Sequence, residues 1–175
     1  MQGQFEEIDM CEAEHVAWLK TQRDPALWHL AAMAVLAYYR DLHGFLHWLL
    51  EQPEMDRATG GWIFLWAEGS RYLRGETSFS LNYISDEKMV ALFRSLCERS
   101  EGVGFSRDDL GLDPDFEPAR KACLDVVARN ELAAGIIVPR QIISRSFAAP
   151  KRDTRFMLDD GLIISLNLLR HLPSR

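Results

Sequence analysis

The sequence predicts a mainly α fold: a single-domain helical bundle of about six to eight helices over residues 1–175. A short β-hairpin near the C-terminus stays open as an addition to it. Three observations predict this class. A composition of 47% hydrophobic and 26% charged residues is typical of a folded globular protein. A chain of 175 residues can bury roughly two thirds of its unfolded surface. Apolar residues recur at spacings of three and four, next to helix-capping residues.

The first half of the chain supplies three of the expected helices. Residues 6–22 place apolar side chains on one helical face and carboxylates on the other. Asp24 and Pro25 then form a helix start, because an aspartate side chain accepts an unpaired backbone N–H and proline fits the first turn. The following helix, 25–39, is apolar nearly all round and is therefore expected at the centre. A short helix over 42–51 follows.

A glycine pair lies inside the next expected helix, 57–68, which Asp56 caps. Two interior glycines each cost about 1 kcal/mol relative to alanine, so we expect Gly60 and Gly61 at a close helix crossing. A phosphate-binding loop would need a preceding strand and a GxGxxG or GxxxxGK[ST] pattern, and the sequence has neither.

The second half is expected to be helical as well. Ser85 caps a strongly amphipathic helix over 85–99, and 118–134 has the same periodicity. The segment 135–148 is ambiguous between strand and helix because a proline interrupts its β-branched pairs. A final helix over 161–172 fits the spacing better than a strand does.

The sequence contains no recognisable catalytic or cofactor-binding motif. No GxSxG motif is present, and Cys11, Cys97 and Cys123 are widely spaced without a CxxC pair. We interpret these thiols as reduced and buried, and we expect a protein that is not an enzyme and that has no cofactor.

One metal-binding alternative is kept. His43, His47 and Glu51 are four residues apart, so a helix would stack them on one side, where imidazoles can bind zinc or another transition metal. Position 44 is glycine, whereas the zincin motif has glutamate there. We favour a packed helix face with partly exposed histidines, and a metal-binding enzyme or sensor is the alternative function.

The charge distribution narrows the possible partners. The formal net charge is -6, which argues against nucleic-acid binding because phosphates require a basic surface. Residues 1–118 hold 21 acidic and 10 basic side chains, whereas 119–175 hold 5 and 10. The N-terminal residues do not resemble a signal peptide, and the longest apolar stretch, 28–39, is too short to cross a membrane. We expect a cytoplasmic protein with no membrane contact.

Carboxylates gather in two places, and we predict both as binding surfaces for a basic protein partner. Clustered carboxylates speed the encounter with a basic partner and imitate phosphate. The alternative for the second group is a solvated acidic loop. The first group is Glu6, Glu7, Asp9 and Glu12, and the second is Asp108, Asp109, Asp113, Asp115 and Glu117.

Between residues 29 and 74 the sequence has an ordered series of aromatic and polar residues. They are His29-Leu-Ala, Tyr39, Asp41, Trp48-Leu-Leu, Pro53, Asp56, Ala58-Thr59, Ile63-Phe64, Trp66-Ala67 and Tyr72-Leu73. This order resembles a small bacterial helical domain family of unknown function, with Met55 in place of a cysteine. The resemblance covers about a quarter of the chain, implies a bacterial origin and supplies no catalytic residue.

The overall character is similar to that of immunity proteins, which neutralise a secreted antibacterial toxin by binding it, including those paired with type VI secretion effectors. The leading hypothesis is therefore an immunity or other inhibitory protein whose acidic surface binds a basic toxin, plausibly a nuclease. A homodimeric scaffold is a further alternative.

Overall fold

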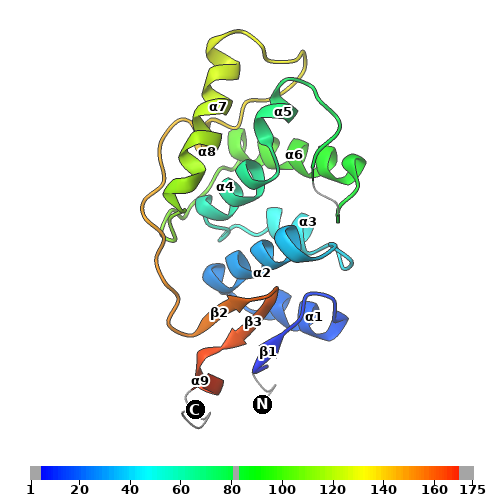
Figure 1. The fold of residues 1–175 in the computed structure, drawn as a ribbon, viewed down its shortest axis with the longest axis vertical. Coiled ribbons are helices and arrows are strands. Elements are labelled where there is room, and N and C mark those ends of the chain that lie inside the picture. Colours follow the sequence, from blue (N-terminus) through cyan, green and yellow to red (C-terminus); the bar gives the residue numbers. More distant parts are fainter. Residues whose placement is uncertain (1–4, 81–82, 170–175) are drawn as a thin grey trace.

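The computed structural model describes residues 5–80 and 83–169, and its elements are mainly helical (Figure 1). The N-terminal elements are β1 (Glu7–Ile8), α1 (Ala13–Thr21), α2 (Pro25–Tyr38) and α3 (Phe45–Leu50). They are followed by α4 (Arg57–Trp66), α5 (Gly69–Leu73), α6 (Asp86–Glu101), η1 (Pro114–Phe116), α7 (Glu117–Ala128) and α8 (Arg140–Ile143). The chain continues through β2 (Phe156–Asp159), β3 (Leu162–Ser165) and α9 (Leu166–Leu169).

A small antiparallel sheet joins the two ends of the described chain. Its strand order is β1-β3-β2, so the first strand pairs with the last one, with Ile8 opposite Ile163. Both β2 and β3 contact α2. Figure 1 shows the sheet and α1 at the foot of the molecule, below α2. The expected hairpin near the C-terminus is confirmed as β2 and β3.

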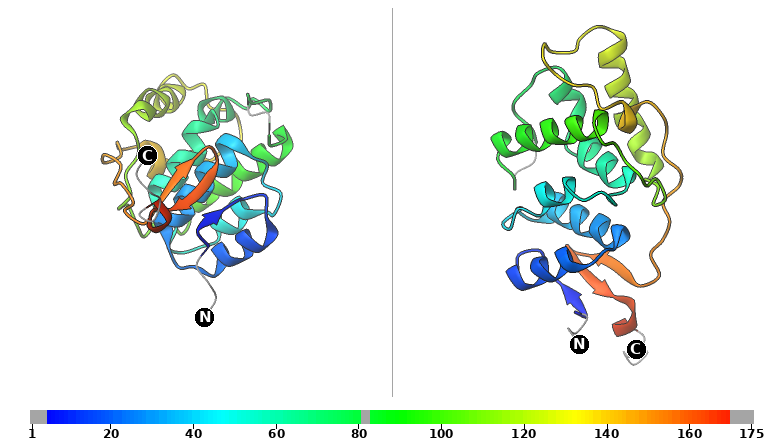
Figure 2. Two further views of the ribbon diagram at one scale, coloured as in Figure 1. Left: turned by 60° about the horizontal axis from the view of Figure 1, so that its bottom comes forward. Right: turned by 180° about the vertical axis from the view of Figure 1, so that it is seen from behind.

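The other helices form the opposite half of the molecule. Helix α4 contacts α2 on one side and α5, α6, α7 and α8 on the other. The two views in Figure 2 show the segment that joins α8 to β2 running along the outside, from the upper half down to the sheet. The C-terminal part of the chain therefore contributes to both halves.

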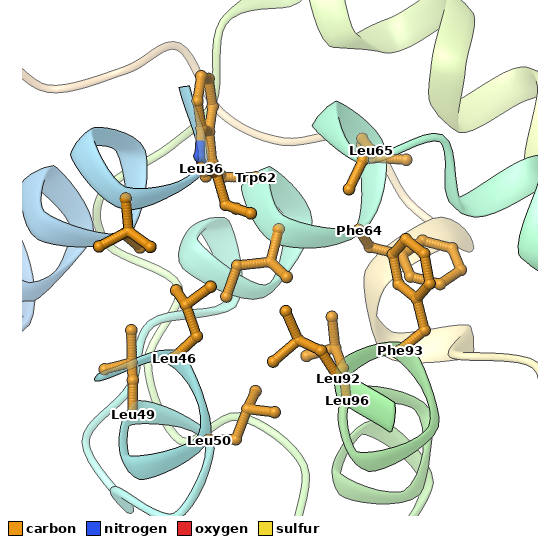
Figure 3. Close-up of a cluster of buried hydrophobic side chains, with 14 of the residues drawn as sticks. Leu36, Leu46, Leu49, Leu50, Trp62, Phe64, Leu65, Leu92, Phe93 and Leu96 are labelled. Atoms are coloured by element: carbon orange, nitrogen blue, oxygen red, sulfur yellow. The ribbon is translucent and has the colours of Figure 1, made fainter. Parts of the chain in front are cut away.

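A hydrophobic core runs between these halves. Figure 3 shows side chains from α2, α3, α4 and α6 meeting in one cluster, and the labelled residues are all buried. Aromatic contacts add to the apolar packing, since Phe64 and Phe93 meet edge to face with ring centroids 5.4 Å apart. The expectation of a packed, mainly α bundle is confirmed. Within residues 5–80 and 83–169, no helix combines the length and the apolar composition that a membrane span requires.

Helix starts that depend on local signals are confirmed. The side chain of Asp24 accepts a hydrogen bond from Leu27 N at the start of α2, and Asp56 accepts one from Ala58 N at the start of α4. Ser85 caps α6 in the same way. In each case one side chain satisfies an orphan N–H of the first turn.

The predicted helix over 6–22 is wrong in its first half. Glu7 and Ile8 instead form β1, which pairs with β3, and the helix begins only at Ala13. Ile8 points from the sheet into the core, where it is 0% exposed, and its partner Ile163 is equally buried. This burial explains why the segment forms a strand. The partner strand lies more than 150 residues away, so a local helical spacing could not reveal it.

The predicted final helix over 161–172 is also wrong. Asp160 and Gly161 both have positive φ angles of 46° and 84° and form the turn between β2 and β3. Helix α9 begins only at Leu166, and residues 170–172 lie outside the described residues. In 135–148 the helical alternative is confirmed, in the form of the single-turn helix α8 after Pro139.

The glycine pair in α4 permits close packing, and its nearest neighbours are loop side chains, while Ile142 of the short helix α8 lies 3.5 Å from a Cβ placed on Gly60. A Cβ atom on Gly60 would lie 2.8 Å from the Phe105 ring, and one on Gly61 would lie 2.4 Å from the Phe147 ring. Real Cβ atoms do not approach so closely. The glycines therefore let two loops lie against the surface of α4.

Candidate functional site

The first acidic group lies on and beside β1, and the structure adds a carboxylate from the sheet's turn. We define the N-terminal acidic face as Glu6, Glu7, Asp9, Glu12 and Asp160. Glu6, Glu7, Glu12 and Asp160 are exposed, and Asp9 is partly exposed. Alternation along β1 directs Ile8 into the core and Glu7 to solvent. The pairing of β1 with β3 places the turn at Asp160 near the N-terminal carboxylates.

The ionisation of Tyr39 reports the negative potential of this face. Its pKa is raised above the ordinary value, first by partial burial and then by the charges of Asp9, Cys11, Asp160 and Glu7. The pKa of the Cys11 thiol is raised as well, by burial and then by Asp9 and Glu12. Asp9 raises both pKa values, while Asp160 and Glu7 act on Tyr39 and Glu12 acts on Cys11.

Hydrogen bonds fix the loop that joins β1 to α1. Asp9 accepts a hydrogen bond from Cys11 N at 2.8 Å, and Asp9 N donates to His15 Nδ1 at 2.9 Å. His43 Nε2 lies 2.9 Å from the carbonyl oxygen of Cys11. The loop is therefore held from both sides, and the carboxylates that it carries have defined positions.

Two tyrosines at the end of α2 adjoin the face. Tyr38 is 41% exposed, and its ring centroid lies 6.4 Å from that of Tyr39. Gly161 in the turn packs against both, since a Cβ atom there would lie within 2.9 Å of each. Aromatic side chains are enriched at the centre of protein interfaces, whereas carboxylates are typical of the polar rim. Sequence reasoning missed Tyr38, Tyr39 and Asp160, because the β1–β3 pairing brings Asp160 to this face and the contact of α2 with the β2–β3 turn brings the tyrosines.

None of the five carboxylates of the N-terminal acidic face forms an ion pair with the residues that the structure describes. Their charge stays available to an external cation. This separates the face from the second acidic group.

The second group lies between α6 and α7, away from β1 (Figure 1), and most of its charge is neutralised internally. Asp108 pairs with two arginines, Arg57 at 3.3 Å and Arg145 at 2.8 Å. Arg57 is only 1% exposed, so this is a buried cation with a partly buried anion. The structure does not join the two acidic groups into one surface.

Arg57 holds three parts of the chain together. Its Nε donates to Gln141 O at 2.7 Å, and its Nη2 donates to Arg145 O at 2.6 Å and to Ser146 O at 3.3 Å. The ring of Phe147 covers the guanidinium, with 3.9 Å from Cζ to the ring centroid. With Asp108 as counter-ion, every side of the buried cation is occupied.

The remaining carboxylates of this loop divide into two classes. Asp109 pairs with Arg107 at 3.3 Å, and Glu117 pairs with Arg120 at 2.5 Å. The hydrogen bond from Arg120 lowers the pKa of Glu117 to about 2. The other two, Asp113 and Asp115, are exposed and have no cationic partner among the described residues.

Asp113 has a structural task as well. Its side chain accepts a hydrogen bond from Asp115 N at 2.9 Å and so caps η1. Of the five predicted residues in this loop, Asp113 and Asp115 are therefore the two that can still meet a partner's charge.

The metal-binding alternative does not have the geometry that it requires. Gly44 has a φ of 62°, so α3 begins at Phe45 and leaves His43 outside the helix. His43 binds the carbonyl of Cys11, whereas His47 and Glu51 are exposed on and after α3. No group of three or more His, Cys, Asp or Glu side chains in the described part of the chain is arranged to hold a metal ion.

The two predicted acidic groups thus differ in their ion pairs. The carboxylates of the N-terminal acidic face have no ion pair among the described residues, whereas three of the five loop carboxylates have one. Comparison of the chain with protein-family models, with curated proteins and with solved structures gives no significant match in any of the three.

Proposed function

We propose that the protein is an inhibitory binding protein of the immunity type, which neutralises a basic secreted toxin by direct contact. The observation that carries the proposal is the N-terminal acidic face. Asp9, Asp160 and Glu7 act on Tyr39, and no carboxylate of the face has an ion-pair partner among the described residues. A stable fold does not need such an arrangement, because like charges repel one another.

The physical role of the face would be to steer and orient the partner. Complementary charge raises the association rate at low salt and suppresses wrong partners. Tyr38, exposed beside the carboxylates, supplies the apolar contact that charge alone does not provide. Carboxylates around a tyrosine form a good match for lysine and arginine side chains on a toxin.

The class of toxin follows from the same chemistry. A nuclease carries a cationic surface that holds phosphate groups, and clustered carboxylates can occupy such a surface. A type VI effector nuclease is therefore the partner that we would test first, and the cytoplasm is where we would expect the two to meet.

Co-expression in the native host tests the proposal. The toxin candidate is the product of the gene next to this one, and growth is measured with and without this protein. We expect rescue by the natural protein and its loss with Glu7→Lys combined with Glu12→Lys. The association rate with the purified toxin should fall at least about tenfold at low salt, because steering depends on these charges.

Asp125→Lys provides the matched control, since Asp125 is an exposed carboxylate on α7 outside the N-terminal acidic face. It should leave rescue and the association rate nearly unchanged. If neither pull-down nor co-expression finds a toxin, or if Asp125→Lys weakens binding as much as the face variant, the proposal is wrong.

A further inference from the structure

A cavity of about 350 Å³ lies away from the N-terminal acidic face, among α2, α4, η1 and the segment that leads into β2. This volume is within the range of small-molecule sites. The floor is formed by buried apolar side chains, including Trp62, Leu112 and Phe156. The rim carries the exposed charged residues Lys151 and Arg152.

Two backbone hydrogen bonds build one wall of the cavity. Leu112 N donates to Ala148 O, and Lys151 N donates to Leu110 O, both at 2.9 Å. Gly111 permits this contact, because its φ is 74° and a Cβ atom there would lie 2.3 Å from Ala149 O. The wall is therefore held in place by the backbone of two loops.

The interior contains polar groups that the fold does not fully use. The indole N–H of Trp62 is buried and has no acceptor among the described residues, which is uncommon in folded proteins. His29 also lines the cavity, and its Nδ1 lies 2.9 Å from Thr59 Oγ1. Burial lowers the pKa of His29 to about 4, so the imidazole is neutral at pH 7. The polar side chains of the interior, Trp62 and His29, thus carry no net charge at pH 7.

The aromatic walls favour a flat ligand. Trp62 stacks on Trp66 with ring centroids 4.9 Å apart and an interplanar angle of 14°. Phe116 meets the Trp62 ring edge-on at 5.1 Å. Another ring could extend this cluster in the same offset or edge-to-face geometries.

The charges at the rim indicate the sign of the charge that a ligand would carry. Five cationic residues lie between positions 140 and 155. Arg140, Arg145 and Arg155 form ion pairs, whereas Lys151 and Arg152 have none among the described residues. Both of the unpaired cations line the cavity.

The two carboxylates at the rim do not reverse this preference. Asp153 pairs with Arg155 at 2.9 Å, but Arg155 also pairs with Asp24 at 2.6 Å, and Asp113 is exposed and opposes an anion. The formal charges of the rim therefore balance, and Lys151 and Arg152 are its cations without an ion pair among the described residues.

We propose that this cavity binds a small aromatic carboxylate. The ring system lies among the aromatic and apolar walls, and the carboxylate lies at the rim, where Lys151 and Arg152 neutralise it. This inference concerns a second site and does not depend on the proposed toxin-binding function.

Titration with 1-naphthoic acid tests the site, with 1-naphthalenemethanol as the neutral probe of the same ring. Affinity is measured by calorimetry, and the indole N–H signals are followed by NMR, with Trp62→Phe to assign the Trp62 signal. We expect the acid to bind about tenfold more tightly at low salt and the Trp62 signal to shift. Each exposed charge contributes up to about fivefold.

Charge variants separate the rim from the floor. Lys151→Gln with Arg152→Gln should abolish the preference for the acid, whereas Asp113→Asn should strengthen acid binding about twofold to threefold. The matched control is Lys121→Gln with Arg129→Gln, two exposed cations on and just after α7, which should change neither affinity.

A filling variant, Ala26→Phe, places a ring in the cavity and should weaken both probes at least about tenfold. The exposed rim variants keep the proposal testable if this variant does not fold. Equal affinity for the two probes, an unmoved Trp62 signal, or an equal loss in the control variant would overturn the proposal. Loss of toxin rescue in the face variant has no bearing on these outcomes.

Discussion

The N-terminal acidic face and the loop between α6 and α7 have similar numbers of carboxylates but use them differently. In the loop, Asp108 and Glu117 are bound to arginines that are almost fully buried. On the face, Glu7 and Glu12 have no cation partner among the described residues. Similar clusters in a sequence can therefore hold a fold together in one place and leave charge for a partner in another.

The location of the arginines decides the difference. Arg57 lies at the start of α4. Its guanidinium donates hydrogen bonds to three carbonyl oxygens and also pairs with Asp108. A buried guanidinium without a counter-ion is unfavourable, and Asp108 of the loop supplies the carboxylate for Arg57. In the described part of the chain the buried cations are Arg57, Arg99 and Arg120, and none of them lies next to β1. The carboxylates Asp108 and Glu117 of the loop neutralise buried arginines, whereas the carboxylates of the face neutralise no buried cation among the described residues.

The largest expected effect concerns Arg57. Arg57→Ala should lower the free energy of unfolding by about 3–5 kcal/mol, because Asp108 and several carbonyl groups lose their donor. Urea unfolding followed by circular dichroism measures this. Arg107→Ala is the matched control, since its pair with Asp109 is exposed and should change stability by less than about 0.5 kcal/mol. Equal effects of the two variants would refute the difference between buried and exposed pairing.

Acidification should produce the next largest effect, in two windows. The pKa of His29 is lowered from 6.5 to about 4 in the folded chain. Between pH 6.5 and pH 4, His29 is therefore protonated in the unfolded chain but neutral in the folded chain. Stability should fall by about 2–3 kcal/mol between pH 6.5 and pH 4. The pKa of Glu117 is lowered to about 2, so its contribution is present above pH 4.5 and is lost as the pH falls toward 2.

The pH dependence of the urea midpoint checks both windows. His29→Gln should remove most of the upper step, and Glu117→Gln should remove the lower one. Glu7→Gln with Glu12→Gln should leave both steps in place. A lower step that persists in Glu117→Gln would show that the Arg120 pair does not stabilise the fold.

The smallest expected effect is the change in protein stability when carboxylates of the N-terminal acidic face are replaced. Glu7→Gln with Glu12→Gln removes repulsion between like charges, so the free energy of unfolding should stay within about 0.5 kcal/mol, with any change upward. Thermal and urea unfolding both measure this. Asp108→Asn provides the comparison in the loop and should destabilise. A loss above about 1 kcal/mol on the face would mean that its carboxylates do structural work.

Sequence reasoning succeeded where the signal was local. The caps Asp24, Asp56 and Ser85 lie next to the N–H groups that they satisfy, so a short window contains both partners. It failed where the partner was distant. β1 depends on β3, at the other end of the chain, and its few residues carry no pattern of their own.

The candidate site shows the same limit. The carboxylates of both groups could be found by counting charges, but their pairing could not. Arg57 is 51 residues from Asp108, and only the folded chain shows that one acidic group is neutralised and the other is not. The sequence could not predict the roles of the aromatic residues of the face and the cavity either. Their spacing is that of ordinary core residues, and only the folded positions of the loops distinguish them.

The pairing of Ile8 with Ile163 has a consequence for synthesis. The strand that carries Glu7 finds its neighbour only after the ribosome has produced β3, more than 150 residues later. Chains that stop before β3 would lack an assembled N-terminal acidic face, so the proposed inhibitory activity would require a chain that includes β3 and has folded.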